Sequence, residues 1–142
     1  MVKKIGSLAV LLSSLAAGAA YAAPCPNIVG TWNVTLQCVG YPDAQNPGQP
    51  FFGSRTAQFI VQEQHACAFA GTFFNGDEMV GVLSGPGGNT INWTWLTVVG
   101  TGEVAPNKKE ITVTYTFSPT AANPGPETAC TGGGVRQLRA PT

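Results

Sequence analysis

Charged side chains are scarce in this chain of 142 residues, of which only 10% are Asp, Glu, Lys or Arg. Seven acidic residues balance seven basic ones, and His65 is the single histidine. The chain has no cluster of Lys and Arg that would bind a phosphate backbone, so no nucleic-acid partner is expected. A lone histidine, without a second one or a carboxylate cluster at ligand spacing, predicts no metal site and no cofactor.

Catalytic motifs are missing as well. The chain has no Gly-x-Ser-x-Gly segment that would present a nucleophilic serine to the histidine. The spacing of its seven carboxylates does not indicate a glycosidase pair, and the neighbours Asp77 and Glu78 point to opposite faces of an expected strand. We therefore expect a protein without enzymatic activity.

Long apolar runs are also missing, except for one near the start of the chain. Two lysines precede a mostly apolar segment over 8–19, and Ala20-Tyr21-Ala22 follows it. This order predicts a secretory signal peptide over 1–22 and a single mature domain over 23–142. No later segment is apolar over the roughly 20 residues that a membrane-spanning helix needs, so no membrane insertion is expected.

The chain has four cysteines, and all of them lie beyond the expected cleavage point. An exported domain meets an oxidising compartment, where an even number of thiols is typical of disulfides. We therefore expect two disulfides among Cys25, Cys38, Cys67 and Cys130, and a periplasmic or secreted location.

Apolar and polar residues alternate with a period of two along the mature chain, while helical periodicity hardly appears. In the first such segment Trp32, Val34 and Leu36 share one face, and Asn33 and Thr35 share the other. The expected strands lie over 28–37, 57–61, 67–73, 79–84, 91–99, 111–117 and 135–139. If 101–105 forms a further short strand, the count becomes eight.

These short strands, joined by tight turns, predict an all-β fold with an antiparallel up-and-down meander. Because no helix is available to cover the apolar face, the sheet must close on itself or pack on a second sheet. We expect a closed barrel of about eight strands, with a β-sandwich as the alternative and a count of seven strands still open. Glu63 has the parity of Phe59 and Val61, which predicts an inward-pointing carboxyl group near a strand end.

Two long irregular segments, 40–54 and 118–134, would emerge at the same end of an eight-stranded meander. The first of them holds Tyr41, Phe51 and Phe52. Aromatic residues on a long loop often belong to a binding surface or a lid. Exposed loops are also tolerated without any function, because lengthening them costs little free energy.

The apolar faces of the expected strands are rich in aromatic residues, as both a filled core and a ligand cavity would require. The residues on these faces are Trp32, Phe59, Phe69, Phe73, Trp93, Trp95, Tyr115 and Phe117. The candidate ligand-binding residues combine strand and loop aromatics, namely Tyr41, Phe51, Phe52, Phe69, Trp93, Trp95 and Tyr115.

Gly30-Thr31-Trp32 resembles the Gly-x-Trp opening of calycin-type barrels, the lipocalins and avidins. A long first loop, Gly71-Thr72, Leu83-Ser84-Gly85 and Trp93-Thr94-Trp95 follow in a similar order. The resemblance implies an up-and-down barrel in which Trp32 plugs the closed end. It does not imply biotin, because the segment after Trp32 lacks the polar loop by which avidins hold that ligand. Of the later lipocalin motifs, only Arg136 has a loose counterpart.

Four cysteines allow three pairings. If eight strands close antiparallel, the last strand begins where the first ends, which pairs Cys38 with Cys130 and leaves Cys25 with Cys67. A count of seven strands would instead bring Cys130 toward Cys25 and Cys67.

Two functions of different classes fit these features. The first is a barrel that binds a small, largely apolar ligand at its loop-bearing mouth. The second is a protein-interaction module, such as a periplasmic protease inhibitor or an envelope-surface component, in which a solid barrel contacts an exported protein. Small bacterial metalloprotease inhibitors have a similar exported barrel with a Gly-x-Trp start. An open or a packed interior separates the two hypotheses.

Overall fold

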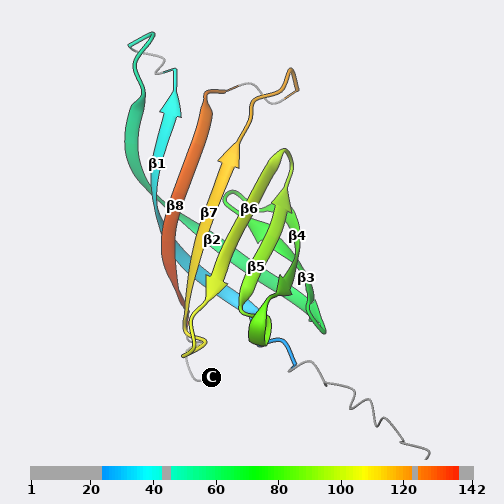
Figure 1. The fold of residues 1–142 in the computed structure, drawn as a ribbon. Coiled ribbons are helices and arrows are strands. Elements are labelled where there is room, and N and C mark those ends of the chain that lie inside the picture. The colour runs from blue at the N-terminus through cyan, green and yellow to red at the C-terminus, as the bar shows by residue number, and fades with distance from the viewer. Residues whose placement is uncertain (1–23, 43–45, 123–124, 138–142) are drawn as a thin grey trace, which may run out of the picture.

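The fold is drawn in Figure 1 from a computed structural model, which describes residues 24–42, 46–122 and 125–137. The predicted signal peptide over 1–22 lies outside these residues. The elements in chain order are β1 (Gly30–Tyr41), β2 (Phe51–His65), β3 (Ala68–Phe73), β4 (Asp77–Ser84), the short 3₁₀ turn η1 (Pro86–Gly88), β5 (Thr90–Trp95), β6 (Val98–Val104), β7 (Glu110–Phe117) and β8 (Glu127–Arg136).

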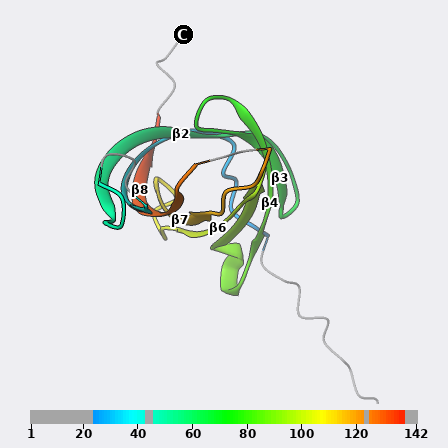
Figure 2. The ribbon, with the colours of Figure 1, turned by 90° about the horizontal axis from the view of Figure 1, so that it is seen from above.

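The eight strands form one closed antiparallel barrel. Each strand pairs with the next in the chain, and β1 also pairs with β8, so the sheet has no free edge. The view from above shows the ring that this closure makes (Figure 2). The prediction of an eight-stranded meander barrel is therefore confirmed, and the β-sandwich and the seven-strand count are wrong.

Aromatic rings fill the middle of the barrel. Phe59, Phe73, Trp93 and Tyr115 project inward from four different strands and meet edge to face, with ring centroids 4.9 Å apart for Phe73 and Trp93 and 6.0 Å apart for Trp93 and Tyr115. Edge-to-face contacts of this kind are favourable beyond the area that they bury. The barrel centre is a packed core.

Two disulfides join the strands as predicted. Cys38 on β1 is bonded to Cys130 on β8, across the pair of strands that closes the barrel. Cys25, which precedes β1, is bonded to Cys67 in the turn between β2 and β3. Cys130 lies within β8 and not before it, because the last strand begins at Glu127 and ends at Arg136, earlier than the predicted 135–139.

The early start of β8 depends on glycines that sequence patterns usually assign to loops. Gly132 lies opposite Leu36 of β1, and a Cβ atom added to it would come within 2.0 Å of the Thr35 carbonyl oxygen. Because β1 approaches so closely here, only glycine fits. The run of three glycines therefore belongs to the closing strand, and the long segment predicted over 118–134 shrinks to the residues between β7 and β8.

We expect Gly132→Ala to lower the free energy of unfolding by about 1–3 kcal/mol, as overpacking a tight site does. Gly133→Ala is the matched control, because the nearest atom to its added Cβ, the Ile111 carbonyl oxygen, is 3.6 Å away. The control should change stability by less than about 0.5 kcal/mol in either direction. Urea denaturation of both variants checks this, and equal stabilities would contradict the close approach of β1 and β8.

A β-bulge in β2 overturns the prediction for Glu63. The register with β3 shifts between Val61 and Glu63, so Glu63 lies opposite Ala70, and its side chain is 66% exposed. The extra residue reverses the alternation that placed Glu63 inward. Gln64 takes the inward position instead.

The end of β5 also differs from the prediction. The strand stops at Trp95 and a turn follows, so Val99 belongs to β6, where it is 68% exposed. The predicted single strand over 91–99 is therefore wrong beyond Trp95. The two turn residues between β5 and β6 separate the strands, so the alternation of inward and outward side chains starts anew at Val98.

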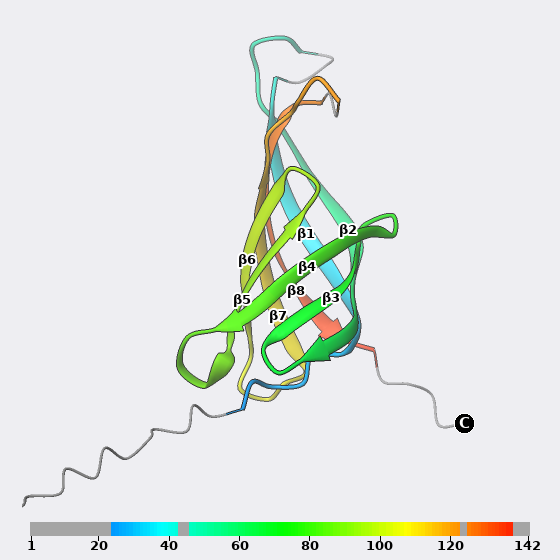
Figure 3. The same cartoon turned by 90° about the vertical axis from the view of Figure 1, so that its right-hand side faces the viewer.

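The N-terminal segment before β1 covers the end of the barrel opposite the long connections (Figure 3). Gln64 accepts a hydrogen bond from the Ile28 amide at 2.9 Å and donates one to the Pro26 carbonyl at 3.0 Å. Trp32 is fully buried beneath this segment, and its indole N–H donates to the Ile28 carbonyl at 2.9 Å. The guanidinium carbon of Arg136 lies 5.3 Å from the centre of the Trp32 ring. These contacts close this end of the barrel.

The two long connections, β1–β2 and β7–β8, lie together at the other end (Figures 1 and 3). Both are shorter than predicted. The residues 51–54, which were expected in the first loop, form the start of β2 and pair with β1. We call this end the mouth of the barrel.

Candidate functional site

A small cavity lies at the mouth, above the packed aromatic core. Its volume is about 260 Å³. The residues that line it come from β2, the β3–β4 turn, β5, β7, β8 and the segment before β8, and they are Phe51, Arg55, Phe74, Trp95, Tyr115, Phe117, Gly125, Pro126 and Thr128. We call this space the mouth cavity. Its walls are mainly aromatic, as is typical of small-molecule sites.

Two aromatic rings form a flat wall of the mouth cavity. Phe74 lies in the β3–β4 turn with a φ of 60°, a conformation that is uncommon for a residue other than glycine. Its ring is nearly parallel to that of Trp95, with an angle of 4° between the planes and 5.7 Å between the centroids. The turn therefore directs an additional ring toward the mouth.

Arg55 brings a positive charge to this cavity. It lies opposite Leu36 in the β1–β2 register, and Leu36 points into the core, so Arg55 occupies an inward position near the mouth. Its guanidinium carbon lies 5.4 Å from the centre of the Phe74 ring, a cation–π arrangement. Among the described residues, the one ion pair joins His65 to Glu63, so Arg55 has no carboxylate partner there.

Two further donors belong to the cavity wall. The indole nitrogen of Trp95 is buried and has no hydrogen-bond acceptor in the described part of the chain. Burial raises the pKa of the Tyr115 hydroxyl, an effect that the nearby charge of Arg55 partly opposes. The hydroxyl of Tyr115 is therefore protonated, and able to donate, throughout the neutral range.

The candidate residues from the sequence fall into three groups. Phe51, Trp95 and Tyr115 line the mouth cavity together. Phe69 and Trp93 are 4% and 2% exposed and belong to the core. Tyr41 and Phe52 also flank the mouth, but they are 54% and 79% exposed and do not line the cavity.

Sequence reasoning missed Arg55 and Phe74. Arg55 has the same parity as Ala57 and Phe59, a signal in the alternation of β2 that could have identified it as an inward residue at the barrel rim. Phe74 gave no such signal, because its direction depends on the positive φ of a turn residue.

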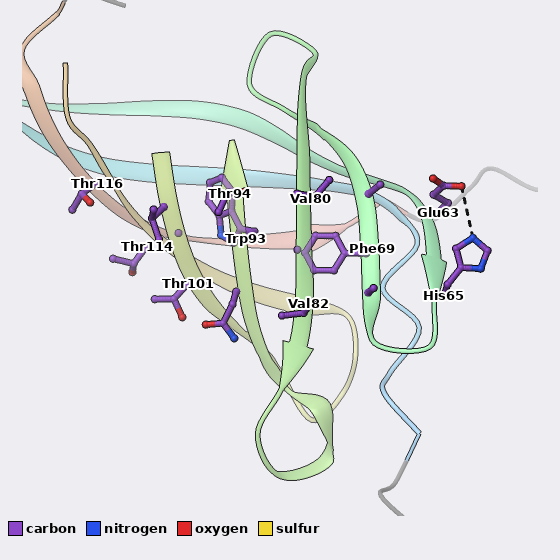
Figure 4. Close-up of a pocket in the computed structure, with 16 residues that line it drawn as sticks. Glu63, His65, Phe69, Val80, Val82, Trp93, Thr94, Thr101, Thr114 and Thr116 are labelled. Atoms are coloured by element: carbon purple, nitrogen blue, oxygen red, sulfur yellow. Dashed lines mark ion pairs between the residues drawn. The ribbon is translucent and has the colours of Figure 1, made fainter. Parts of the chain in front are cut away.

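A larger hollow lies on the outer wall of the barrel. Its volume is about 810 Å³, and it spreads over the outward faces of β3 to β7. Val80 and Val82 from β4 and Thr94 from β5 border it, as Figure 4 shows. Phe69 and Trp93, which belong to the core, also border the hollow. Their rings pack against Gly81 and Gly100, which have no side chains.

The single histidine lies at one edge of this outer hollow. His65 is 3.9 Å from Glu63, and both side chains are largely exposed (Figure 4). The described residues contain no group of three or more His, Cys, Asp or Glu side chains that would hold a metal ion. Within the same residues, no helix has the length and apolar character to cross a membrane.

The fold and its two disulfides define an antiparallel, eight-stranded up-and-down barrel domain. Structural disulfides are typical of proteins in oxidising, extracytoplasmic environments. The chain matches no protein-family model and no curated protein.

Proposed function

We propose that the chain is an exported, non-enzymatic barrel that binds a small, largely apolar ligand at its mouth. The observation that supports this function is the aromatic mouth cavity of about 260 Å³, which is bordered by the barrel rim and by Gly125 and Pro126 before β8. Concave sites with apolar walls and a few polar groups are the usual form of small-molecule sites.

The size of the cavity limits the ligand. The rings of Phe59, Phe73 and Trp93 pack together in the barrel centre, so the mouth cavity does not extend deep into the barrel. If each non-hydrogen atom occupies a volume similar to that of a water molecule, about 30 Å³, the cavity of about 260 Å³ holds about nine such atoms. The proposed ligand is therefore the size of one aromatic ring with a short substituent.

Likeness to calycin-type barrels is part of the same proposal. It is supported by the meander topology and by Arg136, which lies over the ring of Trp32 at the closed end. Periplasmic or secreted location is proposed from the predicted signal peptide, with the two disulfides in support.

Filling the mouth cavity should abolish ligand binding without unfolding the barrel. Thr128 lies on β8 and lines the cavity, so Thr128→Phe places a ring in the space that the ligand would occupy. Ala129→Phe is the matched control, because the next residue of the strand points outward. We expect the parent and the control to bind benzoate or its neutral analogue benzamide saturably, and Thr128→Phe to bind about tenfold more weakly or not at all.

Isothermal titration calorimetry measures these affinities, and circular dichroism confirms that each variant is folded. Saturable binding of neither probe by the parent would contradict the proposed function. Equal binding by Thr128→Phe and the parent would place the site elsewhere.

Contact with an exported protein is the second candidate function. The outer hollow of about 810 Å³ favours it, because Val80, Val82 and Val99 are 59%, 48% and 68% exposed on that wall. Neighbouring exposed apolar side chains are a common feature of protein-interaction surfaces. The two candidate functions use opposite faces of the barrel wall, so Thr128→Phe separates them.

A further inference from the structure

Resting on the proposed function, we propose that the ligand of the mouth cavity is a small planar carboxylate. Its aromatic body stacks within the rings at the mouth, and its anionic head binds to the Arg55 guanidinium, the Tyr115 hydroxyl and the Trp95 indole N–H.

The described wall of the mouth cavity has a donor without an acceptor. The indole nitrogen of Trp95 is buried without an acceptor among the described residues. A buried donor that lacks a partner costs free energy, and most such groups in native proteins are satisfied. Among the other polar side chains on the wall, Thr128 donates to the Pro126 carbonyl at 3.0 Å, and no described residue accepts from the Trp95 indole. A ligand that carries acceptors would satisfy the indole.

The charge of the cavity wall favours an anion. Arg55 lies on this wall, while no Asp or Glu is among the described residues that line the cavity. Arg55 is exposed at the open rim of the cavity, where a cation without a carboxylate partner attracts an anion. The planar guanidinium matches a carboxylate in a bidentate arrangement, which is shorter and stronger than a neutral hydrogen bond.

The shape of the mouth cavity favours a flat ligand. Phe74 and Trp95 are parallel within 4°, and Phe51 and Phe117 also line the cavity. Such walls favour a flat ring over a bulky or flexible chain. Space for about nine non-hydrogen atoms, by the water-volume comparison, corresponds to benzoate. A long-chain fatty acid has the same head group, but most of its chain would lie outside the cavity.

Three probes separate charge from shape. Benzoate carries both the ring and the charge, benzamide keeps the ring without the charge, and cyclohexanecarboxylate keeps the charge without the flat ring. We expect benzoate to bind at least about tenfold more tightly than benzamide, since hydrogen bonds to charged groups are roughly twice as strong as neutral ones. It should also bind more tightly than cyclohexanecarboxylate, because a puckered ring stacks poorly on flat aromatic walls. Decanoate tests the fatty-acid source, and tighter binding of decanoate than of benzoate would overturn the aromatic assignment.

The tryptophan indole signals in a ¹H–¹⁵N spectrum report the contact directly. The chain has three tryptophans, and Trp95→Phe identifies the signal of interest by its loss. Benzoate should move the Trp95 indole signal downfield, whereas the signal of Trp32, whose N–H already donates to Ile28, should stay in place. A benzoate complex that leaves the Trp95 signal unmoved would overturn its role.

Charge-neutral variants complete the test. Arg55→Gln should weaken benzoate binding about tenfold or more and leave benzamide binding nearly unchanged. Lys109→Gln is the matched control, because it removes one positive charge in the β6–β7 turn region, at the opposite end of the barrel. If benzamide binds as well as benzoate, or if Lys109→Gln acts like Arg55→Gln, the carboxylate assignment is wrong and the proposed function stands. If the parent binds none of the probes, the proposed function fails as well.

Discussion

Removing the Cys38–Cys130 disulfide should lower the stability of the barrel by about 4.6 kcal/mol, the value that the chain-entropy model gives for a sequence separation of 92 residues. The bond joins β1 to β8, the strands that close the sheet, so it restricts the unfolded chain across most of its length. The Cys38→Ala/Cys130→Ala double variant, compared with the parent by urea denaturation, measures this loss.

The second disulfide supplies the comparison. Cys25 and Cys67 are 42 residues apart, and the same model gives about 3.9 kcal/mol for their bond. This bond fixes the N-terminal segment to the β2–β3 turn, so its loss should loosen the closed end while the strands remain paired. The Cys25→Ala/Cys67→Ala double variant measures this contribution. If each double variant loses less than about 1 kcal/mol of unfolding free energy, the entropic role of these bonds is contradicted.

Replacing Trp32 by alanine should destabilise the domain by about 3–5 kcal/mol, as truncation of a buried aromatic residue does. Trp32 is fully buried, and its ring lies between the core and the guanidinium of Arg136. The variant would leave a void at the closed end and the Ile28 carbonyl without its indole donor. Chemical denaturation followed by circular dichroism measures the loss.

Trp32→Phe separates packing from hydrogen bonding. The smaller ring keeps most of the apolar contact and the cation–π partner but has no N–H for Ile28, so it should cost about 1–3 kcal/mol. A Trp32→Ala variant as stable as the parent would show that Trp32 does not plug the barrel.

The two ends of the barrel differ in a way that suits the proposed site. The closed end is held by a disulfide, by Gln64 and by Trp32, and the side-chain N–H groups of Gln64 and Trp32 both donate to backbone carbonyls there. The mouth has a buried indole N–H without an acceptor and an arginine without a carboxylate partner among the described residues. Polar groups that are unsatisfied in the free protein are the ones that a ligand can satisfy.

Most of the strand pattern was predictable because alternation depends on local geometry alone. In β7, Ile111, Val113 and Tyr115 alternate with threonines, and the structure buries the three apolar residues as predicted. The disulfide pairing was also predictable once eight strands were assumed, because the position of each strand end in a meander follows from the count. Both predictions are confirmed.

The predictions that were wrong concern residues where neighbouring strands decide the conformation. The glycine run in β8 resembles a loop in isolation, but contact with Thr35 of β1 requires glycine at Gly132. The bulge before Glu63 reverses a side chain that perfect alternation would bury. Neither effect is visible in the residues of one strand.

For the candidate site, the sequence by itself determined the kinds of side chain available: many aromatic residues on the inward faces, few charges and four cysteines for two bonds. It also determined the parity that points Arg55 inward. Only the tertiary structure decided that the central rings pack solidly, that Phe74 stacks on Trp95, and that a small cavity remains beside these two rings at the mouth. The physical reason is that parity specifies the face on which a side chain lies, whereas the space between side chains depends on strand register and turn geometry across the whole barrel.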